Sequence, residues 1–348
     1  MERRTDGASR RDAMLMIGSA ALIPAVARAQ SGAPAARPAA EPAATSARPP
    51  LTLVSRHLQW ASVEEGIDVA REAGFPAIAW TVRPGAHIEP ADVERELPRV
   101  VDLTRKAGLD VPMIITQIGD VGAPRAEAIL TTMRGLRISR YRAGSARYDL
   151  AQPVEPQLDA FKARLAALAE LNERLGTLAM VHTHSRGHQI GGSGWDMWLA
   201  VKDLDPRFVG INFDVGHVTA KGGDGLLESI RAARTHVHAI SVKDFVWRRK
   251  PSPAAEEWAW ETHFVPPGEG MVNFRDIFRF LVESSFNGPL ETYFEYEVEV
   301  PGRDQPVDML GTDFGKWNLE MPRAQFVGLL QRDVGFYRHL MRATGLAA

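Results

Sequence analysis

The sequence predicts a single (β/α)8 barrel, a TIM barrel, over residues 51–348, on three observations. Short apolar runs of the β type alternate with helical patterns along this whole stretch. Eight such pairs in about 300 residues match the size of a (β/α)8 barrel. The alternative, a doubly wound open sheet, is disfavoured because no G-x-G-x-x-G follows the first strand, and the Gly222-Gly223-Asp224-Gly225 run has no P-loop lysine.

Local patterns predict each element. The capping box Ser62-Val-Glu-Glu65 begins the first helix and Gly74 ends it, while Gly108 and Gly176 end two later helices. The expected strands are 53–60, 76–82, 111–116, 136–141, 177–182, 209–213, 237–242 and 289–294. The expected helices are 62–74, 91–107, 125–133, 156–175, 195–202, 226–233, 274–284 and 323–344. Residues 246–273 are expected to form a long loop.

The amino-acid composition excludes several kinds of functional site. The chain has no cysteine, which excludes a disulfide framework, a thiolate zinc site, an iron–sulfur cluster and a cysteine nucleophile. Any metal must therefore bind through His, Asp, Glu or water. Residues 1–50 carry a net charge of +3 and the remainder carries −5, so a nucleic-acid partner is not expected.

The first fifty residues are expected to direct export. Arg10-Arg11 precedes a short apolar run, residues 14–26, which ends at Ala27-Arg28-Ala29. This order is typical of a secretory signal, and the paired arginines resemble a twin-arginine (Tat) signal. A membrane anchor is disfavoured because the run is too short to span a bilayer. We expect a Tat-type signal peptide at 1–29, an Ala/Pro-rich linker at 30–50, and a periplasmic or otherwise exported barrel that does not insert stably in a membrane and that could form a homo-oligomer.

Ionisable residues follow four consecutive predicted strands. His182 and His184 end the fifth, Asp214 the sixth, Lys243 the seventh and Glu295 the eighth. Active sites of (β/α)8 barrels lie at these strand ends, so we expect His182, Asp214 and Glu295 to hold a divalent metal ion. The alternative is a hydrogen-bonded rim without metal. Lys243 is expected to polarise a carbonyl or move a proton, unless it only pairs with Asp244 or Glu295.

Aromatic residues are expected near the same rim. Trp195 and Trp247 follow the fifth and seventh strands, where an indole can stack on the apolar face of a sugar. The alternative for each is packing among the outer helices. Trp80, at the end of the second strand, is also expected at the rim, and His263 is expected to reach the site from the long loop.

These strand-end motifs resemble the xylose isomerase-like TIM-barrel superfamily, in its sugar-phosphate isomerase/epimerase branch. The motifs are Asn212-Phe-Asp-Val-Gly-His217, Ser241-Val-Lys-Asp244, Pro267-Gly-Glu-Gly-Met-Val-Asn-Phe274 and Phe294-Glu295. The resemblance covers residues 51–345 and implies a divalent metal (Mn, Mg, Co or Zn) at the barrel mouth. It implies further that acidic residues move a proton next to a sugar carbonyl.

Carried over by position, the resemblance gives Asp214 as a metal ligand, His217 as a substrate contact, and Glu295 as both a ligand and an acid/base. Two positions depart from the family pattern. His182 stands where a glutamate is usual, and Ser241 stands where a histidine is usual. The departures put the two-glutamate proton shuttle in doubt, so His182, His184 or Lys243 would take the second proton-transfer role.

The sequence therefore predicts an exported, metal-dependent isomerase or epimerase of a sugar or keto-sugar. Glu295 with His184 or Lys243 would abstract and return a proton beside a metal-polarised carbonyl. Two alternatives stay open: a lyase or hydrolase acting on keto-glycosides with the same metal site, and a non-catalytic periplasmic sugar-binding barrel. An endonuclease is disfavoured by the negative charge of the barrel region.

Overall fold

The computed structural model describes residues 48–251, 258–309 and 315–346, which belong to one compact unit. The predicted signal peptide and residues 30–47 of the predicted linker lie outside these residues. Among the described helices, none combines the length and the apolar character needed to cross a membrane.

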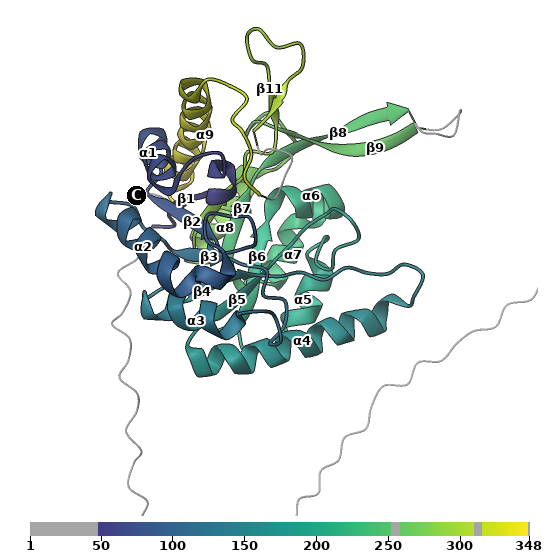
Figure 1. Ribbon diagram of the computed structural model, residues 1–348. Helices are drawn as coiled ribbons and strands as arrows, with labels where there is room; N and C mark the ends of the chain where they lie inside the picture. The colour runs from purple at the N-terminus through teal and green to yellow at the C-terminus, as the bar shows by residue number, and fades with distance from the viewer. Residues whose placement is uncertain (1–47, 252–257, 310–314, 347–348) are drawn as a thin grey trace, which may run out of the picture. The chain divides into compact units, whose positions relative to one another are not determined.

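Eight parallel strands close into a barrel, which confirms the predicted fold class (Figure 1). Around the barrel they follow the order β1-β10-β7-β6-β5-β4-β3-β2. The strands are β1 (Leu51–Val54), β2 (Ala77–Thr81), β3 (Met113–Ile115), β4 (Arg140–Ala143), β5 (Leu178–His182), β6 (Val209–Asp214), β7 (Val237–Val242) and β10 (Leu290–Thr292). Because all eight run in one direction, their carboxyl ends meet at a single rim.

Helices surround the barrel, as Figure 1 shows. They are α1 (Val63–Ala73), α2 (Val93–Lys106), α3 (Ala126–Gly135), α4 (Val154–Leu175), α5 (Trp195–Val201), α6 (Val215–Gly222), α7 (Leu226–Ala232), α8 (Phe274–Glu283) and α9 (Arg323–Thr344). The predicted capping box is present, since the Ser62 side chain accepts a hydrogen bond from the Glu65 N–H at 3.1 Å. Gly74 ends α1 with a left-handed φ of 87°, which glycine adopts without strain.

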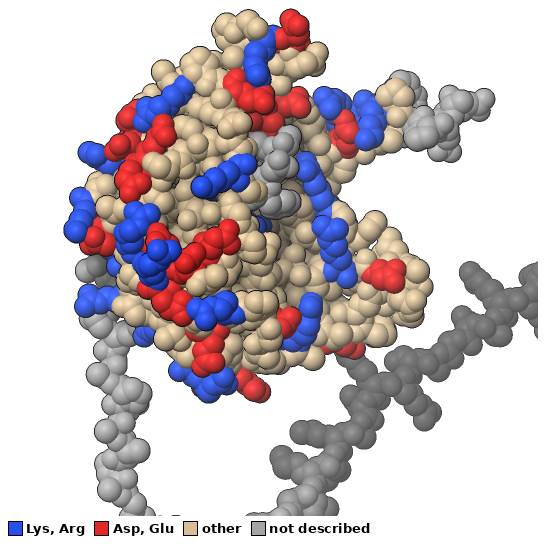
Figure 2. Space-filling view, viewed as in Figure 1, with Lys and Arg blue, Asp and Glu red and all other residues tan. Residues whose placement is uncertain are grey.

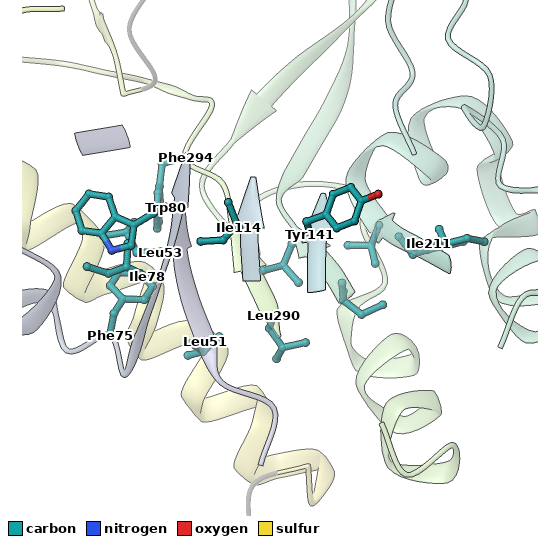
Figure 3. Close-up of a cluster of buried hydrophobic side chains, with 14 of the residues drawn as sticks. Leu51, Leu53, Phe75, Ile78, Trp80, Ile114, Tyr141, Ile211, Leu290 and Phe294 are labelled. Atoms are coloured by element: carbon teal, nitrogen blue, oxygen red, sulfur yellow. The ribbon is translucent and has the colours of Figure 1, made fainter. Parts of the chain in front are cut away.

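Alternating residues of each strand face two different cores. Inside the barrel, Val54, Ala79, Met113, Met180 and Tyr293 belong to one buried cluster. The residues between them in sequence point outward and pack under the helices, and Figure 3 shows part of this outer layer. Trp80 belongs to this outer layer, where its indole N–H donates to Thr104 Oγ1 at 2.9 Å. The expectation that Trp80 lies at the rim is therefore wrong, because the strand alternation turns it away from the barrel axis.

Several predicted boundaries also differ from the structure. Only residues 51–54 of the first apolar run form a strand, and a 3-10 helix, η1 (Ser55–Leu58), follows them. The predicted loop at 246–273 contains an antiparallel hairpin, β8 (Asp244–Pro251) and β9 (Trp258–Val265). The hairpin projects away from the barrel (Figure 1). Because neither face of it packs on the core along its whole length, its sequence lacks the alternation of apolar and polar residues by which a strand is predicted.

Candidate active site

A cavity of about 350 Å³ opens at the carboxyl ends of the barrel strands. Seven barrel strands contribute to its lining through residues at or just after their ends, from Val54 of β1 round to Tyr293 after β10. His182, His184, Lys243 and Glu295, all predicted from the sequence, line it together. The strand-end rule thus places these four side chains around one space.

Three residues beside this cavity could hold a metal ion. His182, Asp214 and His217 are buried, and each offers a ligand atom within 4.8 Å of the others. Two ligands of one ion at about 2.0–2.3 Å stand at most about 4.6 Å apart, so this group is nearly close enough to share an ion. His182 Nε2 lies 3.5 Å from Asp214 Oδ2. His182 Nδ1 is buried without a hydrogen-bond partner among the described residues, and Asp214 Oδ2 is buried between His182 Nε2 and the ammonium of Lys243. Two imidazoles and a carboxylate oxygen gathered in a buried position fit a metal-ligand set.

The local fold explains why Asp214 is held in place. It is the last residue of β6 and the N-cap of α6, where its Oδ1 accepts a hydrogen bond from the His217 N–H at 2.8 Å. Its own N–H donates to Thr183 Oγ1 at 2.8 Å. One oxygen therefore caps the helix while the other faces His182. The capping spacing also fixes His217 one helical turn away, which brings the third side chain into the group.

Lys243 joins the group to Glu295. Its buried ammonium lies 3.1 Å from Asp214 Oδ2, 3.0 Å from Glu295 Oε1 and 2.8 Å from His217 Nε2. The rings of Tyr293 and Phe264 lie 4.7 Å and 5.2 Å from Nζ. Of the two partners expected for Lys243, Glu295 is one and Asp244 is not. Glu295 stands on the far side of Lys243 and is not in the three-residue group, in which His217 takes the third place.

The pKa values of the neighbouring side chains are set by burial and by the positive charge of Lys243. Burial raises the pKa of Asp214 to about 6, although Lys243 opposes the shift. Burial would also raise the pKa of Glu295, but Lys243, His184 and Arg186 together hold it at about 2. Burial and Lys243 lower the pKa of His184 to about 3. At neutral pH, Glu295 is therefore ionised and His184 is neutral.

His182 and His217 are neutral as well. Burial, with the positive charges of Arg142 and Lys243, lowers the pKa of His182 well below its usual range. Burial and Lys243 do the same to His217. Neutral imidazole is the form that binds divalent metals. The His217 ring also stacks on His184, with the ring centroids 3.9 Å apart, and its Nδ1 lies 2.9 Å from Ser185 Oγ.

The other predicted substrate contacts do not line the cavity. Trp195 begins α5 and is 42% exposed, with its ring against Trp198. Trp247 on β8 is 40% exposed. His263 is half-buried on β9, next to Phe264. Because neighbouring strand residues point to opposite faces and Phe264 faces Lys243 and His217, His263 points away from them.

Asp244 has a structural task next to Lys243. Its carboxylate accepts four backbone hydrogen bonds: from the N–H groups of Gly268 and Gly270 at Oδ2, and from those of Phe245 and Val272 at Oδ1, at 2.9–3.1 Å. A Cβ on Gly270 would stand 2.1 Å from Asp244 Oδ1, and Gly268 has a φ of +91°. The two glycines of the Pro267-Gly-Glu-Gly motif therefore allow the loop to close around the Asp244 carboxylate.

Several lining residues were missed from the sequence. Arg56, Arg83 and Arg142 line the cavity on the side of β1, β2 and β4. Arg142 was missed because the fourth strand was predicted to end at Tyr141, whereas β4 runs to Ala143. Arg83 lies two residues after the end of β2, so the rule that active-site residues follow barrel strands could have found it. Below the cavity, Ser241 Oγ lies 2.7 Å from Asn212 Oδ1 and 2.8 Å from the buried Glu291, so the serine departure belongs to a polar network inside the barrel.

Comparison with known proteins agrees with the fold. A family model described as "Xylose isomerase-like TIM barrel" matches residues 67–310. No curated protein sequence matches the chain. A D-psicose 3-epimerase solved in the presence of D-fructose is 15% identical, with a TM-score of 0.59, over 84% of this chain and 99% of that one.

Two further solved structures are similar in shape. The probable 3-DHS dehydratase involved in petrobactin synthesis from Bacillus anthracis is 15% identical, with a TM-score of 0.58, over 83% of this chain and 98% of that one. A xylose isomerase-like TIM barrel protein from Mycobacterium smegmatis in complex with magnesium is 16% identical, with a TM-score of 0.52, over 82% and 97%. At these identities the similarity establishes a shared fold.

Proposed function

Because the chain belongs to the xylose isomerase-like TIM barrel family, we propose that it is a sugar isomerase or epimerase that requires a divalent metal ion. One observation carries the proposal: a buried metal-ligand set, His182, Asp214 and His217, adjoins an ionised carboxylate, Glu295, at one cavity. The relatives in shape include a D-psicose 3-epimerase and a protein in complex with magnesium, which supports the same class.

The metal would be held by His182, Asp214 and His217, and it would act as a Lewis acid that polarises a substrate carbonyl or hydroxyl. The two imidazoles are neutral, and Asp214 Oδ2 faces His182 Nε2 at 3.5 Å. All three side chains are buried, so they are held in fixed positions by the packing around them. Oxygen and imidazole donors suit Mn, Mg, Co or Zn.

Glu295 is the candidate base. It lines the cavity as a carboxylate, and Lys243 at 3.0 Å keeps it ionised at neutral pH. Such a base can take a proton from the carbon next to a carbonyl. His184 lines the same cavity, and its Nδ1 accepts a hydrogen bond from the Arg186 N–H, so the neutral ring carries its proton on Nε2. The proton that Glu295 takes can be returned by Glu295 itself, while His184 can donate a hydrogen bond through Nε2 to a substrate oxygen.

Two measurements test this proposal. Protein purified without chelators should contain about one divalent ion per chain, and Asp214→Asn should lose it, while Asp203→Asn, at an exposed ion pair, should not. With a panel of ketoses and aldoses in D2O, the wild-type protein should introduce deuterium at the carbon next to the carbonyl, and Glu295→Gln should not. Metal-free protein with unaltered turnover would refute the metal requirement. Loss of water from the substrate, in place of exchange, would reassign the reaction to a lyase.

We also propose that the chain is exported. Support comes from the sequence pattern alone: Arg10-Arg11, the apolar run at 14–26 and Ala27-Arg28-Ala29. Expression in a Tat-competent bacterium should place the full chain in the periplasmic fraction. Substitution of both arginines by lysine should retain it in the cytoplasm, and equal distribution of the two forms would refute the proposal.

A further inference from the structure

The cavity also has an arginine wall, which consists of Arg56 of η1, Arg83 after β2 and Arg142 of β4. Lys243 and Glu295 line the same cavity. Figure 2 shows Lys and Arg side chains flanking a hollow on the face that it presents. A ligand in this one space would therefore meet both Glu295 and guanidinium groups.

Two of these arginines, Arg83 and Arg142, differ from Lys243 in their partners. Lys243 is neutralised by Asp214 and Glu295. Arg83 and Arg142, in contrast, form no ion pair with any carboxylate of the described residues. Arg83 donates through Nε and Nη2 to the Thr116 carbonyl at 3.3 Å and 3.0 Å, and Arg142 donates through Nη1 to the Tyr293 hydroxyl. Since a guanidinium has five N–H donors, each keeps donors beyond these contacts.

Holding these groups together is unfavourable without an anion. Burial lowers the pKa of Arg83 to about 9, and the neighbouring charges of Arg142 and Arg56 act in the same direction. The bonds to Thr116 and Tyr293, which line the same cavity, hold the two guanidinium groups in its wall, so their positions do not depend on a ligand. Fixed, poorly neutralised guanidinium groups are the usual binding partners of carboxylates and phosphates.

We propose that Arg83 and Arg142 bind an anionic group of the substrate, a carboxylate or a phosphate, so that the sugar processed here is an acidic one. The inference rests on the proposed function, because it takes the other end of the ligand to be the carbon next to a carbonyl at Glu295. It deepens that function by giving the substrate a required charge. A neutral ketose would leave both guanidinium groups facing water or one another.

Isothermal titration of the full chain with three probes tests the subsite: D-glucuronate, D-glucose 6-phosphate and D-glucose, each with and without Mn²⁺. At least one acidic probe should bind ~10-fold or more tightly than glucose, and added NaCl should reduce the difference. Preference for glucuronate identifies a carboxylate, and preference for glucose 6-phosphate identifies a phosphate. Equal binding of all three probes, or binding of none, would overturn the subsite.

Variants assign the preference to these residues. Arg83→Gln and Arg142→Gln should each weaken the acidic probe by ~10-fold or more and leave glucose unaffected, whereas the exposed Arg95→Gln should change neither. Arg83→Lys keeps the charge and should retain part of the preference if Arg83→Gln does not fold. Binding requires no turnover. If an acidic probe binds but no substrate shows deuterium exchange, the anion subsite is supported and the isomerase proposal is not. If neutral sugars show exchange and Arg83→Gln does not change it, the isomerase proposal is supported and the anion subsite is not.

Discussion

Replacing Asp244 with asparagine should destabilise the protein by about 3 kcal/mol. The carboxylate is buried and accepts four backbone N–H groups, two at each oxygen. An amide keeps one acceptor oxygen and turns an NH2 group toward the other two donors. A hydrogen bond to a charged group contributes about 1.5–3 kcal/mol, so two lost bonds remove about 3–6 kcal/mol. The lower end is expected, because a neutral amide is less costly to bury than a carboxylate.

The free energy of unfolding, measured from urea titrations followed by tryptophan fluorescence, gives the value. Asp304→Asn, at an exposed position, is the matched control and should change it by less than about 0.5 kcal/mol. Since Asp244 holds the backbone on both sides of Glu269, a glutamate-specific protease should also cut after that residue faster in Asp244→Asn. A loss below about 1 kcal/mol would refute the reasoning, because the four bonds would then contribute little net stability.

Three further outcomes are expected. Lys243→Met should tighten Mn²⁺ binding, followed by electron paramagnetic resonance, at least ~10-fold, because the ammonium 3.1 Å from Asp214 Oδ2 would repel a bound ion; unchanged affinity would contradict this. His57 is buried with its pKa lowered by burial from 6.5 to about 3, so the unfolded chain binds the extra proton and stability should fall by about 2 kcal/mol from pH 7 to 5 through this residue. His57→Asn should flatten that slope, and an unaltered slope would show that the residue does not titrate on unfolding. Ser62→Ala should lower the free energy of unfolding by about 1 kcal/mol through loss of the α1 cap, and a change near zero in urea titration would count against the capping bond.

The barrel was predictable because its outward-facing strand positions are apolar and its helices carry clear caps. Ser62, Gly74 and Gly176 are all visible in the sequence and end or begin helices in the structure. The strand-end rule then brought His182, His184, Lys243 and Glu295 to one cavity without knowledge of any distance. Period and capping are local properties, and local properties can be read from one chain.

The pairing inside the site could not be read in the same way. Nothing in the sequence indicates that Lys243 stands between Asp214 and Glu295, because those contacts depend on how three strand ends converge. The arginine wall was missed for a different reason. Arg140 and Arg142 face the interior of the barrel, where the apolar pattern that marks a strand is broken by charge. The charge at these two positions thus removed the pattern that would have located the end of the strand.

The hairpin of β8 and β9 connects the site to a segment that extends away from the barrel (Figure 1). It leaves the barrel directly after Lys243, is anchored at its root by the bonds of Asp244, and returns with Phe264 against Lys243 and His217. Its strands are eight residues long, or about 26 Å at the usual rise. A displacement at the root of the hairpin would therefore move the ring of Phe264 relative to the ammonium of Lys243.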